Sequence, residues 1–321
     1  MNVLVTGGSG FIGSNLCDFL VKKSHKVTVV DNLSTGKISN LVGIINQIDF
    51  FEAGIEDFNF NKCKALDAVI HLAAQPSVPL SLSSFKDSSI SNLLGTIQVV
   101  NYCKQKKIPL VYASSSAIYG NLDKGDDAST KVDLLSPYAA DKYAMEVYAS
   151  VANKAYGLSS IGLRFFNVYG PRSRTSGTYG AVFGVFLAQK LAKKPYTVVG
   201  DGTQTRDFTF VKDVVDAIIA AAESDVSGEA INIGSDNTYS VNQLVELLGG
   251  DVVHIPKRPG EPDCTWADIS KAKKLLNWRP KVSLEEGVGI LMDNIDYWRQ
   301  APVWDEQSIA KATEKWFEYL S

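Results

Sequence analysis

The sequence is poor in the features that mark several classes of protein. Its four cysteines are scattered, without a CxxC pair or a metal-ligand spacing, so reduced thiols and no metal site are expected. The longest apolar runs, such as Val214–Ala222, fall far short of the roughly 18 residues that a membrane-spanning helix needs. A net charge of −3 argues against a nucleic-acid-binding protein, which carries a basic face. No basic region precedes the first apolar run, so no secretory signal is expected.

What remains is typical of a soluble globular protein. The chain has 321 residues, of which 45% are hydrophobic and 21% are charged. A chain of this length can bury a substantial core, as one large domain or as two lobes. Together with the scattered cysteines, these values favour a cytoplasmic protein.

The first half of the chain alternates short apolar runs with helical stretches. Strands that are buried on both faces have such runs, and their alternation with helices implies parallel pairing through right-handed crossovers. The pattern therefore predicts an α/β fold with a doubly wound parallel sheet of the Rossmann type. The expected strands are 2–7, 26–31, 66–74, 108–116 and 159–167, and the expected helices are 92–107 and 136–157.

The pattern changes after about residue 168. Loops rich in Gly, Arg and Ser alternate there with expected helices at 180–193, 212–223 and 241–248. We therefore expect a cofactor-binding Rossmann domain over 1–167, to which later segments return. A smaller, interleaved and mainly substrate-binding lobe is expected over 168–321.

A glycine-rich turn lies between the first expected strand and the helix after it. In "VLVTGGSGFIGSNL", Gly7, Gly10 and Gly13 form the pattern G-x-x-G-x-x-G. Glycines there allow a tight turn and a close approach of the backbone to a pyrophosphate, which the helix N-terminus then binds. The second expected strand ends at Asp31, 18 positions after Gly13. A carboxylate at that place binds an adenosine ribose and repels a 2′-phosphate, so NAD is favoured over NADP.

A second constellation follows the fourth expected strand. Ser115 lies at the end of the expected strand, in "VYASSSAIYG", and "SPYAADK" places Tyr138 and Lys142 four residues apart in the first turns of a helix. Ligands of open α/β sheets bind at the carboxyl ends of strands, so Ser115 is expected to face the cofactor. A tyrosine is a poor base at neutral pH, but a neighbouring ammonium and a positively charged nicotinamide favour its phenolate.

At this point the sequence resembles the extended short-chain dehydrogenase/reductase family, and within it the sugar-nucleotide epimerases of the UDP-galactose (UDP-glucose) 4-epimerase type. The resemblance covers about residues 1–290. It rests on "TGGSGFIG", "HLAAQPSV", "NLLGT", "YASSSAIYG", "SPYAADK", "LRFFNVYGPR", "GDGTQTRDFTFVKDV" and "RPGE…WADISKA".

The resemblance implies a set of site residues. Ser115, Tyr138 and Lys142 are the implied catalytic residues. The family's adenine-binding aspartate is replaced by Gly54, so that contact is expected to pass to the backbone of Ile55. The implied cofactor-binding residues are Gly7, Gly10, Phe11, Ile12, Gly13, Asp31, Asn32, Ile55, Leu72, Ala73, Ala74, Asn92, Tyr138 and Lys142.

The second lobe supplies candidates for binding a nucleoside diphosphate, whose negative charges need fixed cations. Arg206 in "TRDF" and Arg258 in "KRPGE" can form bidentate bonds to phosphate. Both stand at positions that resemble the family's diphosphate clamp, and Glu261 suits a ribose diol. The implied substrate, most simply a UDP-sugar, would contact Ser115, Ser116, Tyr138, Asn167, Arg206, Arg258, Glu261 and Thr265.

The residues that follow Ser115 favour one reaction among three that share this triad. Related dehydratases and decarboxylases carry acids just after the catalytic serine or threonine, whereas this chain has Ser116 and Ala117. The sequence therefore favours NAD-dependent C4 epimerisation of a UDP-sugar through a 4-keto intermediate. Two alternatives stay open: a 4,6-dehydratase or decarboxylase that takes its acid from elsewhere, and a non-catalytic NAD-binding regulator.

The resemblance also raises the questions of substrate size and assembly. A residue four positions after the ribose-binding acid lines the pocket for the C2 substituent, and here it is Thr265. A small residue leaves room for an N-acetyl group, while glucose, N-acetylglucosamine and uronic acid forms all remain open. The family likeness also implies a homodimer through a four-helix bundle formed by helices 92–107 and 136–157.

Overall fold

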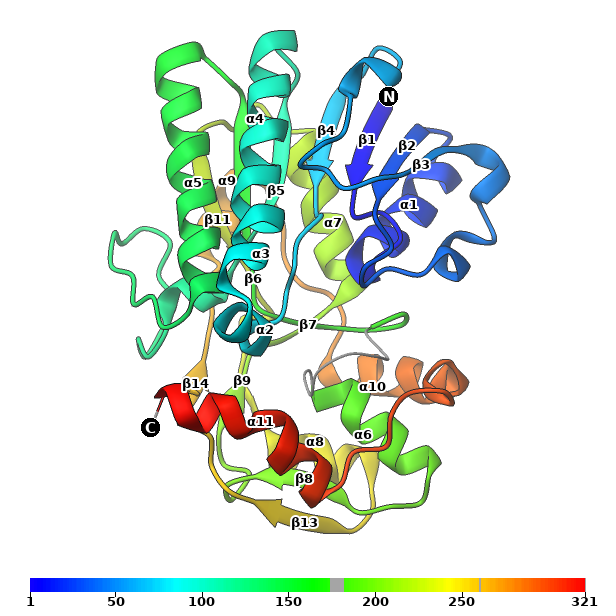
Figure 1. Ribbon diagram of the computed structural model, residues 1–321, viewed down its shortest axis with the longest axis vertical. Coiled ribbons are helices and arrows are strands. Elements are labelled where there is room, and N and C mark those ends of the chain that lie inside the picture. The colour runs from blue at the N-terminus through cyan, green and yellow to red at the C-terminus, as the bar shows by residue number, and fades with distance from the viewer. Residues whose placement is uncertain (174–181, 260, 321) are drawn as a thin grey trace.

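The computed structural model describes residues 1–173, 182–259 and 261–320. Within these ranges, seven strands form the central sheet in the order β11-β6-β5-β4-β1-β2-β3. Each neighbouring pair is parallel, which confirms the predicted doubly wound α/β fold (Figure 1). The strands are β1 (Asn2–Thr6), β2 (Lys26–Asp31), β3 (Ile48–Glu52), β4 (Ala68–His71), β5 (Leu110–Ser115), β6 (Ser160–Phe165) and β11 (Glu229–Ile233).

Helices cover both faces of this sheet. On one face α1 (Phe11–Lys22), α7 (Val211–Ala222) and α9 (Ser270–Leu275) contribute to a core that contains Leu16 and Ile218. On the other face α4 (Gly95–Lys106) and α5 (Pro137–Tyr156) contribute Val99 and Met145 to a second core, and the two helices lie side by side (Figure 1). The strand order reverses between β1 and β4, which is where ligands bind in folds of this kind.

Two strands of the sheet did not stand out in the sequence. β3 has only partly buried and exposed residues, so "IDFFE" lacks a continuous apolar run. β11 lies beyond residue 168, where the regular alternation has ended, yet it pairs with β6 and extends the sheet. Helix α7 and strand β11 thus return to the first domain from the later half of the chain.

The smaller lobe has its own core, which includes Phe186, Leu244 and Leu291. Its main elements are β7 (Asn167–Tyr169), α6 (Val182–Leu191), β8 (Tyr196–Val199), β9 (Thr205–Arg206), β10 (Phe208–Phe210), β12 (Tyr239–Ser240), α8 (Val241–Leu248), β13 (Val252–Ile255), β14 (Cys264–Thr265) and α10 (Leu284–Asp293). Expected helix 180–193 appears as α6, and its first two positions lie outside the described residues.

The C-terminal tail forms helix α11 (Glu306–Leu320), which joins the two parts of the molecule. Ile309 is buried in the core of the smaller lobe. The same helix lies against α2 (Val78–Ser83), which follows β4 of the large sheet (Figure 1).

Short helices complete the described chain. They are η1 (Ile38–Leu41), η2 (Ile45–Gln47), η3 (Phe60–Lys62), α3 (Phe85–Ser89), η4 (Ile90–Leu94), η5 (Ser116–Tyr119) and η6 (Ile295–Trp298). In the part of the chain that the structure describes, no helix has the length and apolar character needed to cross a bilayer. The same residues contain no group of three or more His, Cys, Asp or Glu side chains placed to hold a metal ion.

Candidate active site

The glycine turn has the geometry that its sequence predicts. Gly7 follows β1 with a φ of +71°, a conformation that side chains with a Cβ rarely adopt. A Cβ on Gly13 would lie 2.2 Å from the Gly7 carbonyl oxygen, so the helix can pass this close to the turn only with glycine there. Gly10 precedes the first turn of α1 and offers no capping side chain, and Phe11 and Ile12 open the helix. The N–H groups at the start of α1 are therefore placed to bind an anion.

Asp31 fixes the loop after β2 to the glycine turn. Its carboxylate accepts hydrogen bonds from the backbone N–H of Ser9 at 2.9 Å and of Leu33 at 2.8 Å. Burial raises the pKa of Asp31 above its usual value, and these two bonds oppose that rise. Asn32, next along the loop, accepts a bond from the N–H of Ser34 and stays exposed.

The loop after β4 is tied to the end of β1 by one hydroxyl. Thr6 Oγ1 accepts from the N–H groups of Leu72 at 3.2 Å and Ala73 at 3.1 Å, so the chain leaves the sheet at His71 and not at residue 74 as expected. The His71 ring forms hydrogen bonds with the hydroxyls of Thr6 and Thr96, one through each ring nitrogen. Burial, with the Lys142 charge, lowers the pKa of His71 to about 3, so the ring is neutral at physiological pH. Ala74 continues this loop.

Asn92 supports the same loop from a short π-helical turn. Its side chain is fully buried, accepts from the N–H of Gln75 at 2.8 Å and donates to Asp141 at 3.3 Å. A single π turn inside a helix is frequent at functional sites. Here it turns the amide of Asn92 toward the loop that follows β4, with Ile55 buried nearby beneath Gly95.

Ser115, Tyr138 and Lys142 converge at the carboxyl end of β5. Ser115 Oγ accepts from the N–H of Ala117 at 3.1 Å and is hydrogen-bonded to the Tyr138 hydroxyl. Lys142 Nζ lies 5.8 Å from the centre of the Tyr138 ring and donates to the Ala113 carbonyl at 2.8 Å. Ser116 begins η5 beside them.

The protein itself does not make Tyr138 a strong base. Burial raises the pKa of Tyr138, and the hydrogen bond with Ser115 opposes that rise. Burial lowers the pKa of Lys142 to about 8, with Asp141 acting in the opposite direction. An added positive charge beside the phenol is therefore needed to bring its pKa toward neutral pH.

The start of α5 is held in two ways. Ser136 caps the helix by accepting from the N–H of Ala139 at 3.2 Å. The backbone N–H of Tyr138 itself donates to Ser81 Oγ on α2 at 3.2 Å. Because α11 lies against α2, the C-terminal helix supports the segment that holds the tyrosine.

In the smaller lobe, Glu261 brings the two arginines together. Arg206 Nη2 donates to one carboxylate oxygen of Glu261 at 3.0 Å, and Arg258 Nε lies 3.1 Å from the other, outside hydrogen-bond geometry. Arg206 and Glu261 line a cavity of about 360 Å³. The other lining residues are Val199, Gly200, Asp201, Thr203, Gln204, Lys257, Pro262 and Asp263.

Asn167 and Thr265 meet at the junction of the two lobes. Thr265 Oγ1 donates to Asn167 Oδ1 at 2.8 Å and accepts from the N–H of Asp207 at 3.3 Å. The Thr265 hydroxyl therefore already donates its proton within the protein and is not free to donate to a ligand.

Sequence reasoning missed several residues that hold the site in place. Asp207 accepts from the N–H groups of Ser235 at 2.6 Å and Ala267 at 3.2 Å, and burial raises its pKa to about 6. Glu146 and Arg164 form a buried ion pair behind Ser115. The sequence held one signal for this pair, because Glu146 follows Lys142 by one helical turn and therefore lies on the same face of α5.

The chain is similar to known proteins over most of its length. Residues 3–234 match the family described as NAD dependent epimerase/dehydratase. Among solved structures, the UDP-glucose 4-epimerase of Thermotoga maritima, in complex with UDP-glucose, is 36% identical. It covers 94% of this chain and 99% of its own, with a TM-score of 0.86.

Two further structures differ in their sugar. The UDP-glucuronic acid 4-epimerase of Bacillus cereus, solved as a variant with NAD and a fluorinated substrate analogue, is 34% identical. It covers 92% of this chain and 99% of its own, with a TM-score of 0.86. The UDP-N-acetylglucosamine 4-epimerase of Methanobrevibacter ruminantium, in complex with UDP-N-acetylmuramic acid, is also 34% identical. It covers 91% of this chain and 98% of its own, with a TM-score of 0.85.

Proposed function

This chain belongs to the NAD dependent epimerase/dehydratase family, and we propose that it is an NAD-dependent 4-epimerase of UDP-sugars. One observation carries the proposal. Ser115, Tyr138 and Lys142 meet at the carboxyl end of β5, on the sheet whose glycine turn and Asp31 suit a dinucleotide.

The protein's own groups have distinct tasks in this reaction. Tyr138 removes the proton from the sugar 4-hydroxyl and later returns it, as a general base and then a general acid. Ser115 donates a hydrogen bond to the oxygen at C4, and Lys142 holds the nicotinamide ribose while its charge favours the phenolate. When bound, NAD supplies the acceptor and then the donor of the C4 hydride, and the positive charge that Tyr138 needs.

The surroundings of Ser115 support epimerisation over loss of water or CO₂. Ser116 and Ala117 follow it and bring no carboxyl group. Glu146, a buried carboxylate behind Ser115, is bound by Arg164 and Ser114 and is therefore not placed to protonate a leaving group. The 4-keto sugar can then rotate and take the hydride back on its other face. The product therefore keeps the mass of the substrate.

The cavity of the smaller lobe suits the nucleotide half of the substrate. Arg206 and Arg258 would bind the diphosphate through charge-assisted hydrogen bonds. Glu261 would accept from the ribose diol and Asn167 would add a polar contact. Glu261 already draws the two guanidinium groups together, so both cations are in place for one dianionic group.

The small side chain of Thr265 favours substrates with an N-acetyl group at C2. Its hydroxyl is turned toward Asn167. UDP-N-acetylhexosamines, with or without oxidation at C6, are therefore expected to be accepted alongside or ahead of UDP-glucose.

The cofactor is NAD, because Asp31 is buried at the ribose site and repels a 2′-phosphate. Two like charges near a protein surface repel by roughly 1 kcal/mol or more, depending on the local dielectric. Titration of the apo protein in a calorimeter should give clearly weaker binding of NADP than of NAD, and equal affinities would contradict this assignment.

We also propose that the protein is a cytoplasmic homodimer, and the outer face of α5 supports the dimer. Val147, Tyr148 and Val151 are exposed on one side of this helix, and Leu94, the residue before α4, is exposed as well. Pairing α4 and α5 with their copies would cover these side chains in a four-helix bundle. Light scattering should give twice the chain mass, and Val151→Glu should shift the protein toward monomer.

The decisive test of the reaction is a panel of UDP-sugars. Glucose, galactose, glucuronic acid and both N-acetylhexosamine forms are incubated with the NAD-loaded protein. The products are resolved at C4 by NMR and weighed by mass spectrometry. Interconversion of C4 epimers without change of mass supports the proposal, whereas loss of water or CO₂ points to a dehydratase or decarboxylase.

A further inference from the structure

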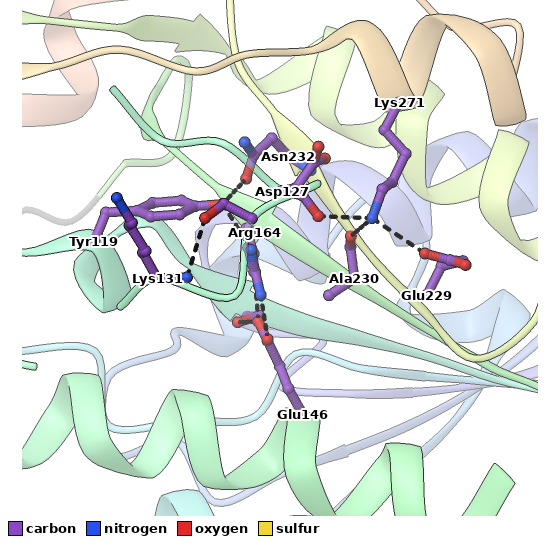
Figure 2. Close-up of polar contacts among 11 residues, drawn as sticks. Tyr119, Asp127, Lys131, Glu146, Arg164, Glu229, Ala230, Asn232 and Lys271 are labelled. Carbon is purple, nitrogen blue, oxygen red and sulfur yellow. Dashed lines mark hydrogen bonds and ion pairs between the residues drawn. The ribbon is translucent and has the colours of Figure 1, made fainter. Parts of the chain in front are cut away.

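A buried ion pair lies directly behind the catalytic edge of β5. Arg164 on β6 binds Glu146 on α5 through Nε at 2.9 Å and Nη2 at 2.6 Å (Figure 2). Each side chain exposes only 8% of its surface. Glu146 Oε1 also accepts a hydrogen bond from the Ser114 hydroxyl at 2.5 Å.

The far side of Arg164 is fixed as well. Its Nη1 donates to the Tyr119 hydroxyl at 2.7 Å, which in turn donates to Asn232 Oδ1 on β11 at 2.8 Å (Figure 2). The amide of Asn232 donates to the backbone carbonyls of Gly125 at 3.0 Å and Asp268 at 3.1 Å. The guanidinium is therefore held by a network that spans three strands and the loop between η5 and α5.

This network joins the two elements that carry the triad. Ser114 directly precedes Ser115 on β5, and Glu146 lies on α5 one turn after Lys142. Lys142 binds the carbonyl of Ala113, so consecutive residues of β5 are bonded to successive turns of α5. Two such bonds restrict sliding of the strand end along the helix, and they fix Ser115 relative to Tyr138.

We propose that Glu146 is a positioning residue: held by Arg164, it binds Ser114 and so sets the Ser115 hydroxyl against the Tyr138 hydroxyl. The inference rests on the proposed function. Replacing a buried ion pair by apolar residues is often neutral or stabilising, so fold stability alone does not require this pair. Proton transfer does require close placement, because a shift of about 1 Å can cost on the order of 10²-fold in rate.

The test removes one bond and leaves the ion pair intact. In Ser114→Ala, Glu146 still accepts two hydrogen bonds from the Arg164 guanidinium, one on each carboxylate oxygen, so no buried charge loses its partner. Ser114→Thr retains the hydroxyl as the conservative variant. Ser160→Ala is the matched control, because Ser160 is a buried serine at the first position of β6, at the other end of that strand from Arg164.

Two readouts are measured on each variant. The first is kcat and KM with the UDP-sugar that the wild type accepts. The second is the pKa of Tyr138 in tyrosine-labelled protein, followed by ¹³C NMR, with the signal assigned by its loss in Tyr138→Phe. The groups that face Tyr138 are Ser115 from β5, Lys142 from its own helix and Ser81 from α2.

For Ser114→Ala we expect kcat to fall about 10-fold with KM nearly unchanged, because the loss lies in placement and not in substrate binding. The pKa of Tyr138 should rise, since a looser Ser115 stabilises the phenolate less. Ser114→Thr should recover both values, and Ser160→Ala should change neither.

A Ser114→Ala protein with wild-type kcat and an unmoved Tyr138 pKa overturns the positioning role. So does an equal loss in Ser160→Ala, which would mark a general effect of buried serines. If the wild type epimerises no UDP-sugar, the proposed function fails by itself. The NMR titration of Tyr138 then still decides whether Ser114 and Glu146 set the Ser115–Tyr138 contact.

Discussion

The carboxyl end of β5 and the arginine cluster of the smaller lobe hold their charged groups in different ways. At β5 the charges are tied to the protein's own backbone and to buried partners: Lys142 binds the Ala113 carbonyl, and Glu146 is enclosed by Arg164. In the smaller lobe, Arg206 and Arg258 share Glu261, whose side chain is 24% exposed at the cavity.

The difference follows from what each region does in the proposed reaction. Groups that transfer a proton must be in place before the substrate arrives, because their geometry sets the rate. Groups that bind a diphosphate need positive charge and must be accessible to the ligand. Before the ligand binds, the carboxylate of Glu261 compensates the charges of the two neighbouring arginines. Changes at the first region should therefore act on kcat, and changes at the second on KM.

The largest effect is expected for Tyr138→Phe. The ring remains and the proton acceptor is lost, so kcat should fall by the roughly 10²–10⁴-fold typical of a general base. Thermal unfolding and NAD binding should stay close to the wild type, which separates chemistry from folding. A folded variant with near wild-type turnover of the UDP-sugar would remove Tyr138 from the reaction.

Arg206→Ala tests the other region. It removes a charged donor to a group far from C4, so KM should rise about 10- to 100-fold while kcat changes little. Arg206→Lys keeps the charge but not the paired donors, so its KM should lie between those of the wild type and Arg206→Ala. Lys281→Ala, an exposed lysine paired with Asp216, is the matched control for a lost positive charge. A fall in kcat as large as that in Tyr138→Phe would erase the distinction between the regions.

Thr265→Tyr probes the point where the regions meet. The aromatic ring of the introduced tyrosine is much larger than the threonine side chain, and overpacking a fitted site costs roughly 1–3 kcal/mol. The loss in kcat/KM should fall on UDP-N-acetylglucosamine and spare UDP-glucose. An equal loss for both sugars, or a wild type that rejects the N-acetylated sugar, would show that another wall sets substrate size.

The smallest effect near neutral pH concerns His71, which ends β4, the strand next to β5. Its pKa is about 3 in the folded protein and 6.5 without the fold, so the unfolded chain binds more protons between these values. Its contribution to stability is therefore complete above pH 6.5 and is lost as the pH falls toward 3.

His71→Gln should flatten this acid-side dependence of the unfolding free energy. Asp207 has a pKa of about 6 against a usual 3.8, so it acts with the opposite sign between those values. Because Asp207 is present in both proteins, the difference between them isolates the histidine. Parallel stability curves from pH 3 to 7 would contradict a buried neutral His71.

Much of the cofactor half could be predicted from local patterns. Apolar runs gave β1 and β2 almost to the residue, because strands buried on both faces leave a continuous signal. The helix of Tyr138 was expected at 136–157 and spans Pro137–Tyr156, with Ser136 as its cap. Strand β3 was missed, since its half-exposed residues carry no such run.

The sequence by itself determined which residue types stand at the ends of which strands, and so the glycine turn, Asp31 and the Ser115–Tyr138–Lys142 set. Only the tertiary structure decided which residues, distant in the sequence, pair with one another to hold the two regions in place. Arg206 and Glu261 are 55 positions apart, and Tyr119 and Asn232 are 113 apart. A local pattern reflects neighbours along one helix or strand, whereas these contacts depend on how separate elements pack. Their partners can therefore be identified only after the chain has folded.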